Sequence, residues 1–248
     1  MQIVDEFNFF SKKYQNFRPS YPENLFTWIS ETTLEHELVI DCGTGNGQAA
    51  IPLSRYFNRV IAIDSNENQL EEAVLCKNIE YKKSPAEKID LLDASADLIV
   101  AASSAHWFNL DLFYKECKRI LKPDGRIIIW TYTWPETENL KMSFTLLKIK
   151  EQLNPYWSKE SLYHINKYKN LPFPFKQYPN PEFQFSKEWT SGELLDFLLT
   201  WACISHIIKT VDNNFKYKMK KIITNGYNGN EKIRFDFPLY VKAGIHLV

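Results

Sequence analysis

The sequence lacks the features typical of secreted, membrane-spanning and nucleic-acid-binding proteins. Its four cysteines are scattered without a Cys-x-x-Cys pair, so neither a disulfide framework nor a cysteine metal site is indicated. No apolar run approaches the roughly 18 residues that span a bilayer, and the N-terminus carries no basic segment followed by an apolar stretch. Basic and acidic residues balance at 30 each, so no overall field attracts nucleic acid or an anionic membrane. We therefore expect a cytoplasmic protein, monomeric or homodimeric, that binds neither a membrane nor nucleic acid.

The chain carries enough apolar material for a large core, since 44% of its 248 residues are hydrophobic. Short β-rich runs alternate with helical stretches, which indicates βαβ units and a parallel sheet. The expected strands are residues 37–42, 59–63, 78–82, 97–101 and 126–132, with a last strand around 233–243. The pattern predicts an α/β fold with a Rossmann-like, doubly wound and mostly parallel seven-stranded sheet.

A glycine-rich turn follows the first expected strand. Gly43, Gly45 and Gly47 lack a Cβ, which lets the backbone approach a ligand closely, although a tight turn without a ligand would also use them. Asp64 ends the second strand about twenty residues beyond the glycines, where a carboxylate accepts hydrogen bonds from ribose hydroxyls. The alternative for Asp64 is capping of the helix that follows.

Asp41, directly before the turn, indicates the charge of the ligand. A carboxylate repels a diphosphate but attracts an ammonium or sulfonium group, so the sequence predicts a cationic cofactor. A nicotinamide-dependent oxidoreductase would share the strand, turn and acid. Its usual Gly-x-Gly-x-x-Gly spacing is absent, because Gly47 follows Gly45 by two positions.

These motifs resemble those of the class I S-adenosylmethionine-dependent methyltransferases. The resemblance covers about residues 37–130 and comprises, in family order, the segments 39–47, 62–65, 84–87, 96–100 and 119–126. It implies S-adenosyl-L-methionine as the cofactor, with Gly43, Gly45 and Gly47 bordering the methionine portion, Asp41 near its amino group, Asp64 on the ribose, and Ala86 with Glu87 lining the adenine pocket. Pro85 departs from the family, which often has a polar residue at this position. The resemblance therefore implies that the backbone amide of Ala86, rather than a side chain at position 85, contacts the adenine.

Three further segments resemble a narrower branch, the type 11 methyltransferases similar to trans-aconitate methyltransferase. They are residues 14–22, 105–108 and 189–201. This resemblance implies that the N-terminal segment, with Tyr14 and Arg18, folds over the donor. Arg18 could then pair with the donor's carboxylate or with an acidic acceptor, and the alternative is a surface salt bridge.

The candidate for the chemistry is His106, which follows the carboxyl end of the fourth strand, where open α/β sheets bind ligands. It could act as a base or orient the acceptor, or it could be a histidine hydrogen-bonded beneath a lid. Trp107 could form a wall of the methyl-transfer site or belong to the core. Tyr21 and Trp157 are further candidates for the acceptor pocket.

Residues 134–185 interrupt the regular pattern with an expected helix, 139–152, followed by prolines and aromatic residues. We interpret this segment as a lid or acceptor-binding insert after the fifth strand, within one domain over 1–248 whose donor-binding core is about 37–133. Its aromatic residues Trp157, Tyr163, Tyr168, Phe173 and Phe175 would supply the pocket or pack on the helices beneath.

The expected function is in-line transfer of a methyl group to a small-molecule acceptor, with a carboxylate as one candidate. Such a displacement needs alignment and exclusion of water, and a carboxylate acceptor needs no base. No His/Cys cluster indicates a metal. The alternative of a different class is a non-catalytic module that binds S-adenosylmethionine.

Overall fold

The structure, a computed structural model of the chain, describes residues 20–227 and 231–247. Contacts divide these residues into two compact units, which we describe separately. The sheet unit contains residues 20–133, 163–183 and 238–247, and the helical unit contains residues 134–162, 184–227 and 231–237. Tyr14 and Arg18 lie outside the described residues.

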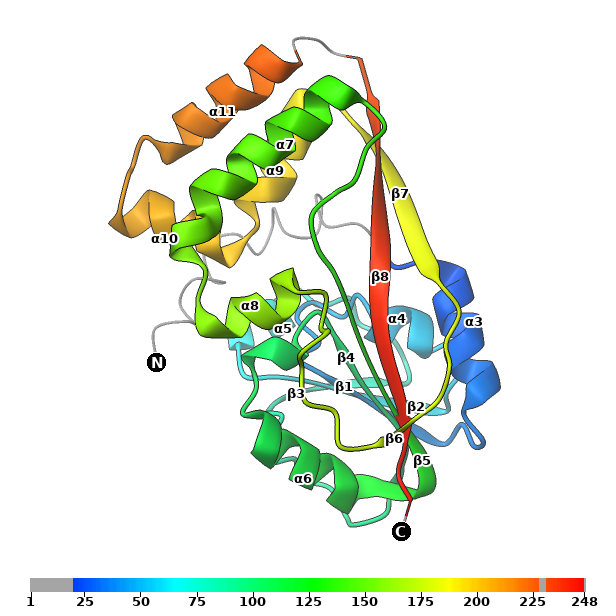
Figure 1. The fold of residues 1–248 in the computed structure, drawn as a ribbon. Helices are drawn as coiled ribbons and strands as arrows, with labels where there is room; N and C mark the ends of the chain where they lie inside the picture. Colours follow the sequence, from blue (N-terminus) through cyan, green and yellow to red (C-terminus); the bar gives the residue numbers. More distant parts are fainter. Residues whose placement is uncertain (1–19, 228–230, 248) are drawn as a thin grey trace. The chain divides into compact units, whose positions relative to one another are not determined.

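The sheet unit is built on a mostly parallel sheet, which confirms the predicted fold class (Figure 1). Its strands are β1 (Leu38–Cys42), β2 (Arg59–Asp64), β3 (Ile79–Lys83), β4 (Ala96–Ala102), β5 (Leu121–Tyr132), β6 (Lys176–Gln177) and β8 (Ile233–Ile245). Their order is β3-β2-β1-β4-β5-β8-β6, where β1 to β5 pair in parallel and β8 runs antiparallel to both β5 and β6.

The predicted number of seven strands is wrong, because β7 (Phe183–Trp189) also pairs with β8 and brings the sheet to eight. This strand lies at the end of the segment that we interpreted as an irregular insert. Phe183, Phe185 and Trp189 are buried while most residues between them are exposed, which is the period-two pattern of a strand. The prolines that precede it at 172, 174, 179 and 181 obscured the pattern.

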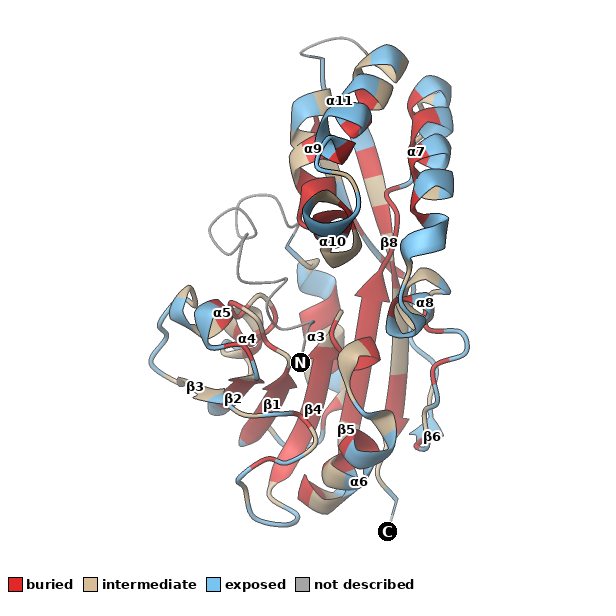
Figure 2. Cartoon of the chain, turned by 90° about the vertical axis from the view of Figure 1, so that its left-hand side faces the viewer, coloured by how far each residue is buried: buried red, intermediate tan, exposed pale blue. Residues whose placement is uncertain are grey.

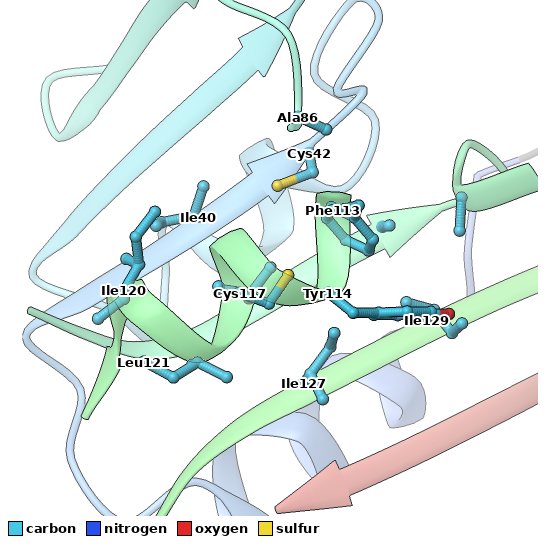
Figure 3. Close-up of a cluster of buried hydrophobic side chains, with 14 of the residues drawn as sticks. Ile40, Cys42, Ala86, Phe113, Tyr114, Cys117, Ile120, Leu121, Ile127 and Ile129 are labelled. Atoms are coloured by element: carbon cyan, nitrogen blue, oxygen red, sulfur yellow. The ribbon is translucent and has the colours of Figure 1, made fainter. Parts of the chain in front are cut away.

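Helices cover both faces of the sheet unit, whose central strands β4 and β5 are buried along most of their length (Figure 2). On one face, α6 (Leu110–Ile120) packs Phe113, Tyr114 and Cys117 against Ile127 and Ile129 of β5 (Figure 3). On the other face, α3 (Glu23–Thr32) places Phe26 against Trp130, with ring centroids 6.3 Å apart. This sandwich of helices and sheet is the doubly wound arrangement.

The helices that follow β1 and β2 are short. The helix after the glycine turn, α4, covers only Ala50–Leu53, and α5 covers Glu67–Glu71. Pro52 explains the late start of α4, since proline is tolerated only in the first turn of a helix. The glycine turn therefore remains non-helical as far as Ala49.

The helical unit consists mainly of α7 (Leu140–Leu153), α9 (Ser191–Leu199), α10 (Ala202–Thr210) and α11 (Phe215–Gly226) (Figure 1). A reciprocal capping box between Thr190 and Glu193 starts α9. Within the described residues no single helix is long and apolar enough to cross a membrane. Only α9 and α10 taken together, with a bend of 81° between them, reach the length and hydropathy of a spanning segment. A further helix, α8 (Lys159–Ile165), leads from the helical unit into the sheet unit.

Candidate active site

The glycine turn has a backbone that only glycine adopts without strain. Gly43 and Gly47 have φ values of 67° and 91°. A Cβ on Gly43 would lie 2.6 Å from Cβ of Ser104, and one on Gly47 would overlap the hydroxyl of Tyr81. Neither Gly43 nor Gly47 can therefore carry a side chain. This allows a ligand or a neighbouring strand to approach the backbone of the turn closely.

Asp41 is the strongest indication of what the turn binds. Its side chain is fully buried, and Oδ2 accepts a hydrogen bond of 2.6 Å from Oγ1 of Thr44. Within the described residues Oδ1 has no hydrogen-bond partner. Burial raises the pKa of Asp41 to about 7, although Thr44 and the backbone of Ala50 lower it. A buried carboxylate with an unsatisfied oxygen fits the ammonium group of a methionine moiety.

Asp64 braces the turn from the neighbouring strand. Its Oδ2 accepts from the backbone N of Gly45, and its Oδ1 accepts from the backbone N of Asn66, each at 2.8 Å. Burial is the largest cause that raises the pKa of Asp64. The N-cap of α5 is Asn66, whose side chain accepts from the backbone N of Asn68, and Asp64 holds the backbone N of this cap residue. Each oxygen keeps a second lone pair, so the ribose assignment stays a prediction that this geometry permits.

The loop after β3 supplies the remaining cofactor candidates. Ala86 is buried beside Cys42 in the core (Figure 3). The Oε1 atom of Glu87 accepts a hydrogen bond of 2.7 Å from the backbone N of Asn109, directly before α6. Glu87 therefore links this loop to the start of α6, and the adenine pocket stays a prediction for both residues.

His106 lies at the carboxyl edge of the sheet, as the sequence predicted for it. β4 ends at Ala102, and a short 3₁₀ helix, η1 (Ala105–Trp107), carries His106. Ser104 connects η1 to the glycine turn, because its Oγ donates a hydrogen bond of 2.7 Å to the carbonyl of Cys42. The candidate catalytic residue and the glycine turn are thus joined through one serine.

His106 is 5% exposed and is surrounded by aromatic and polar groups. Its Nδ1 lies 2.9 Å from the hydroxyl of Tyr168, and its ring centroid lies 5.1 Å from that of His164 and 4.8 Å from that of Trp107. The structure thus shows the hydrogen-bonded environment that we considered as an alternative, and it places that environment at the edge where ligands bind.

Sequence analysis did not select three residues of this cluster, Ser103, Thr131 and His164. Thr131 Oγ1 lies 2.8 Å from Nδ1 of His164 and 3.5 Å from Oγ of Ser103. Ser103 and Thr131 could have been selected from their position in the chain, because they stand at the carboxyl ends of β4 and β5, which are neighbours in the sheet. His164 gave no such signal, since it follows the fifth strand by a long insert.

The other pocket candidates are distributed over both units. In the sheet unit, the hydroxyl of Tyr21 donates a hydrogen bond of 3.4 Å to Oγ of Ser103. In the helical unit, Trp157 packs on Trp201 at a centroid distance of 6.0 Å. The insert residues Phe173 and Phe175 pack against Tyr114 of α6, with centroids 6.1 and 5.8 Å away. Tyr21 therefore adjoins the polar cluster, while Phe173 and Phe175 belong to the core.

No group of three or more His, Cys, Asp or Glu side chains in the described part of the chain is arranged to hold a metal ion. The site is instead defined by a buried acid, a glycine turn and a second acid at the carboxyl edge of a parallel sheet. A site of this kind binds a cationic adenosine cofactor.

Comparisons with known proteins show to which family this chain, with its site for a cationic adenosine cofactor, is similar. Residues 40–129 match the family described as "Methyltransferase domain". A Dictyostelium discoideum protein classed as a methyltransferase is 33% identical over 96% of this chain and 93% of its own length. A Saccharomyces cerevisiae protein classed as an S-adenosylmethionine-dependent methyltransferase is 31% identical over 66% of this chain and 56% of its own length.

A solved structure from Anaeromyxobacter dehalogenans, classed as a type II methyltransferase, is similar in fold and in sequence. It has a TM-score of 0.83 and 28% identity, and the match covers 93% of this chain and 99% of that one. The chain belongs to the S-adenosylmethionine-dependent methyltransferases, and its cofactor is S-adenosyl-L-methionine.

Proposed function

We propose that this methyltransferase acts on a small carboxylic acid and forms its methyl ester. The observation that carries the proposal is the position of His106, buried in a cluster of hydroxyl and imidazole groups and joined through Ser104 to the glycine turn. A buried neutral imidazole held by neighbouring hydroxyl groups can donate a hydrogen bond to a carboxylate oxygen.

Two lysines on the same side of the sheet support an anionic acceptor. Thr131 and Ile129 pair with Tyr240 and Lys242 of β8, and residues that face each other across an antiparallel pair share a face. Burial lowers the pKa of Lys242, which indicates a cation held partly out of water. Nζ of Lys167 lies 4.8 Å from the ring centroid of Tyr240. An anion bound at Thr131 would offset the unfavourable burial of Lys242.

Methylation of a carboxylate fits a site without a dedicated base. When bound, S-adenosylmethionine would supply an electrophilic methyl carbon. A carboxylate oxygen would attack this carbon in line with the C–S bond, so that the C–O bond of the methyl ester forms as the C–S bond breaks and S-adenosylhomocysteine leaves. Carboxylic acids are ionised at neutral pH, so the protein has to orient the acceptor and exclude water. In this proposal His106 orients the acceptor, and Trp107 and Tyr21 line its pocket.

The same proposal gives roles to the remaining cofactor candidates. Asp41 holds the amino group of the donor, Asp64 the ribose, Ala86 and Glu87 the adenine, and Tyr14 and Arg18 cover the donor. The likeness of segments 14–22 and 105–108 to trans-aconitate methyltransferase supports an acidic acceptor. The alternative, a module that binds the donor without turnover, predicts binding and no product.

The test is transfer of an isotopically labelled methyl group to a panel of di- and tricarboxylic acids, each paired with its uncharged primary amide and with an alcohol and an amine of similar size. We expect label in an acid-derived product that mild base releases as methanol, and none from the amides. Transfer to the alcohol or the amine would contradict the carboxylate assignment. Tight binding of S-adenosylhomocysteine with no product from any acceptor would favour the binding module.

A further inference from the structure

A row of polar side chains leads from Tyr21 to His106 within the sheet unit. The Tyr21 hydroxyl donates to Oγ of Ser103 at 3.4 Å, and this Oγ lies 3.5 Å from Oγ1 of Thr131. Oγ1 of Thr131 also lies 2.8 Å from Nδ1 of His164, whose ring faces that of His106 at 5.1 Å between centroids. On its other side, Nδ1 of His106 lies 2.9 Å from the hydroxyl of Tyr168.

The direction of these hydrogen bonds follows from the number of protons that each hydroxyl group can donate. Each hydroxyl donates one proton, so Ser103, which accepts from Tyr21, has its own proton left for Thr131. The hydroxyl of Tyr168 is buried, and Nδ1 of His106 is the hydrogen-bond partner found for it among the described residues. The proton of Tyr168 therefore points to Nδ1 of His106, and burial raises the pKa of Tyr168 well above its usual range, so this proton is retained.

We propose that Tyr168 is a positioning residue that fixes His106 in the tautomer protonated on Nε2, so that His106 donates a hydrogen bond to the acceptor carboxylate. This inference rests on the proposed function for the identity of the acceptor. An imidazole whose Nδ1 accepts from a hydroxyl carries its proton on Nε2 and acts as a donor there. His106 therefore orients the carboxylate and does not remove a proton.

The same row assigns the opposite tautomer to the second histidine. Nδ1 of His164 lies 2.8 Å from Oγ1 of Thr131. Because the Thr131 hydroxyl donates its one proton to the carbonyl oxygen of Tyr132 at 3.3 Å, Nδ1 of His164 donates its proton to Thr131. His164 and His106 face each other at 5.1 Å between ring centroids and differ in which nitrogen is protonated.

The backbone around Tyr168 supports a positioning role. Lys167 and Tyr168 have φ values of 61° and 56°, in the left-handed region, which costs a non-glycine residue about 1–2 kcal/mol each. Two hydrogen bonds of 2.9 Å hold this turn, from the N atoms of Lys167 and Tyr168 to the carbonyls of His164 and Tyr163. Strained turns of this kind recur where a side chain must be held in one place, and here that side chain is the 1%-exposed Tyr168.

The direct test is nitrogen-15 NMR of the histidine rings in the full-length protein saturated with S-adenosylhomocysteine. The chain has five histidines, so His106→Asn and His164→Asn variants assign the two signals. Tyr168 and His164 are the titratable side chains found against His106 in the described residues, so spectra are compared over the pH range in which imidazoles titrate. We expect Nε2–H for His106 and Nδ1–H for His164, and a signal of His106 as Nδ1–H would overturn the proposal.

Tyr168→Phe supplies the functional test, with Tyr114→Phe as its matched control. Tyr114 is also buried in the sheet unit, and its hydroxyl donates at 2.6 Å to the carbonyl of Pro172, away from His106. We expect Tyr168→Phe to lower kcat/KM for the acid by roughly ten- to a hundredfold and to give a mixture of His106 tautomers, while Tyr114→Phe changes neither. A Tyr168→Phe protein with an unchanged His106 spectrum would contradict the positioning role.

The two proposals fail in different ways. Ester formation with a His106 protonated on Nδ1 would keep the function and reject the role of Tyr168. A His106 protonated on Nε2 in a protein that methylates only alcohols or amines would keep the hydrogen-bond direction and reject the carboxylate acceptor.

Discussion

The Oδ2 atom of Asp64 accepts a hydrogen bond of 2.8 Å from the backbone N of Gly45, the central glycine of the turn. The end of β2 therefore fixes the conformation of the loop that follows β1. The same carboxylate holds the backbone N of Asn66 with its other oxygen. A residue expected either to contact the cofactor or to cap the next helix thus also shapes the turn that precedes it.

Replacement of Asp64 by alanine should affect both stability and binding. Loss of two hydrogen bonds to a carboxylate should lower the free energy of unfolding by about 2 kcal/mol, and loss of the ribose contacts should raise the Kd of S-adenosylhomocysteine at least about tenfold. Calorimetry and chemical denaturation measure the two effects.

Asp97→Asn is the matched control, because Oδ2 of Asp97 also accepts from two backbone amides, those of Glu37 and Leu38, at 2.8 Å each. Asp97 lies at the start of β4 and holds the start of β1, at the edge of the sheet opposite the glycine turn, so stability should fall while the Kd changes less than about twofold. An unchanged Kd in Asp64→Ala would remove Asp64 from the ribose site.

Asp41→Asn should stabilise the ligand-free protein and weaken donor binding. At pH 8 the buried carboxylate is charged with Oδ1 unsatisfied, and the rise of its pKa from 3.8 to about 7 corresponds to about 4 kcal/mol. Asparagine removes this charge and keeps an oxygen for Thr44, so the unfolding midpoint should rise. The Kd of S-adenosylhomocysteine should rise at least about tenfold, since the ammonium loses its counter-ion. An unaltered Kd would show that the amino group is bound elsewhere.

The pKa of Asp41 also predicts a proton linked to donor binding. A raised folded-state pKa means that the stability contributed by Asp41 is fully present below about pH 4 and is lost as the pH rises through about 7. The ammonium of the donor favours the ionised form, so binding at pH 6 should release close to one proton, and affinity should increase up to about pH 7.

Calorimetry in buffers of different ionisation enthalpy measures that proton. The Asp41→Asn variant is the control and should release none. Proton release that persists in this variant would assign the linkage to another group.

Lys242→Gln tests the charge of the acceptor. If Lys242 offsets an anionic acceptor, its removal should raise KM for the acid roughly tenfold and leave the Kd of S-adenosylhomocysteine unchanged. Lys176→Gln is the matched control, since Lys176 is an exposed residue of β6 in the same unit. Equal effects of both substitutions would indicate general electrostatic attraction rather than a contact at Thr131.

The sequence was sufficient to predict the parts of the fold whose signal is local. The parallel strands of the core and the glycine turn carry β-rich runs with glycine or acid at their ends, and each lies within a few residues of its predicted place. The resemblance to methyltransferases also allowed the cofactor to be predicted. The position of His106 after β4 also followed from chain order, because the carboxyl ends of parallel strands meet at one edge.

The insert was harder to interpret because its signals are non-local. Beyond the insert, α11 was not among the expected elements, although Phe215, Met219 and Ile223 recur every four residues and are buried on one face. Tyr168 and His164 reach His106 only because the chain returns to the sheet unit at residue 163. No periodicity within the insert predicts that return, since it depends on packing against α6 and β5.

The contact between Gly43 and Ser104 should couple the donor turn to His106. Gly43→Ala places a methyl group 2.6 Å from Cβ of Ser104 at φ 67°, which should cost about 2–4 kcal/mol of stability. Because Ser104 leads into η1, turnover should fall together with donor affinity.

Gly192→Ala is the control, since its added Cβ meets nothing closer than 3.9 Å and should change stability by less than about 1 kcal/mol. Ser104→Gly removes the opposing Cβ, so the double variant should recover about 1 kcal/mol over the sum of the single effects. Simple additivity in this cycle would show that the turn and η1 are not in contact.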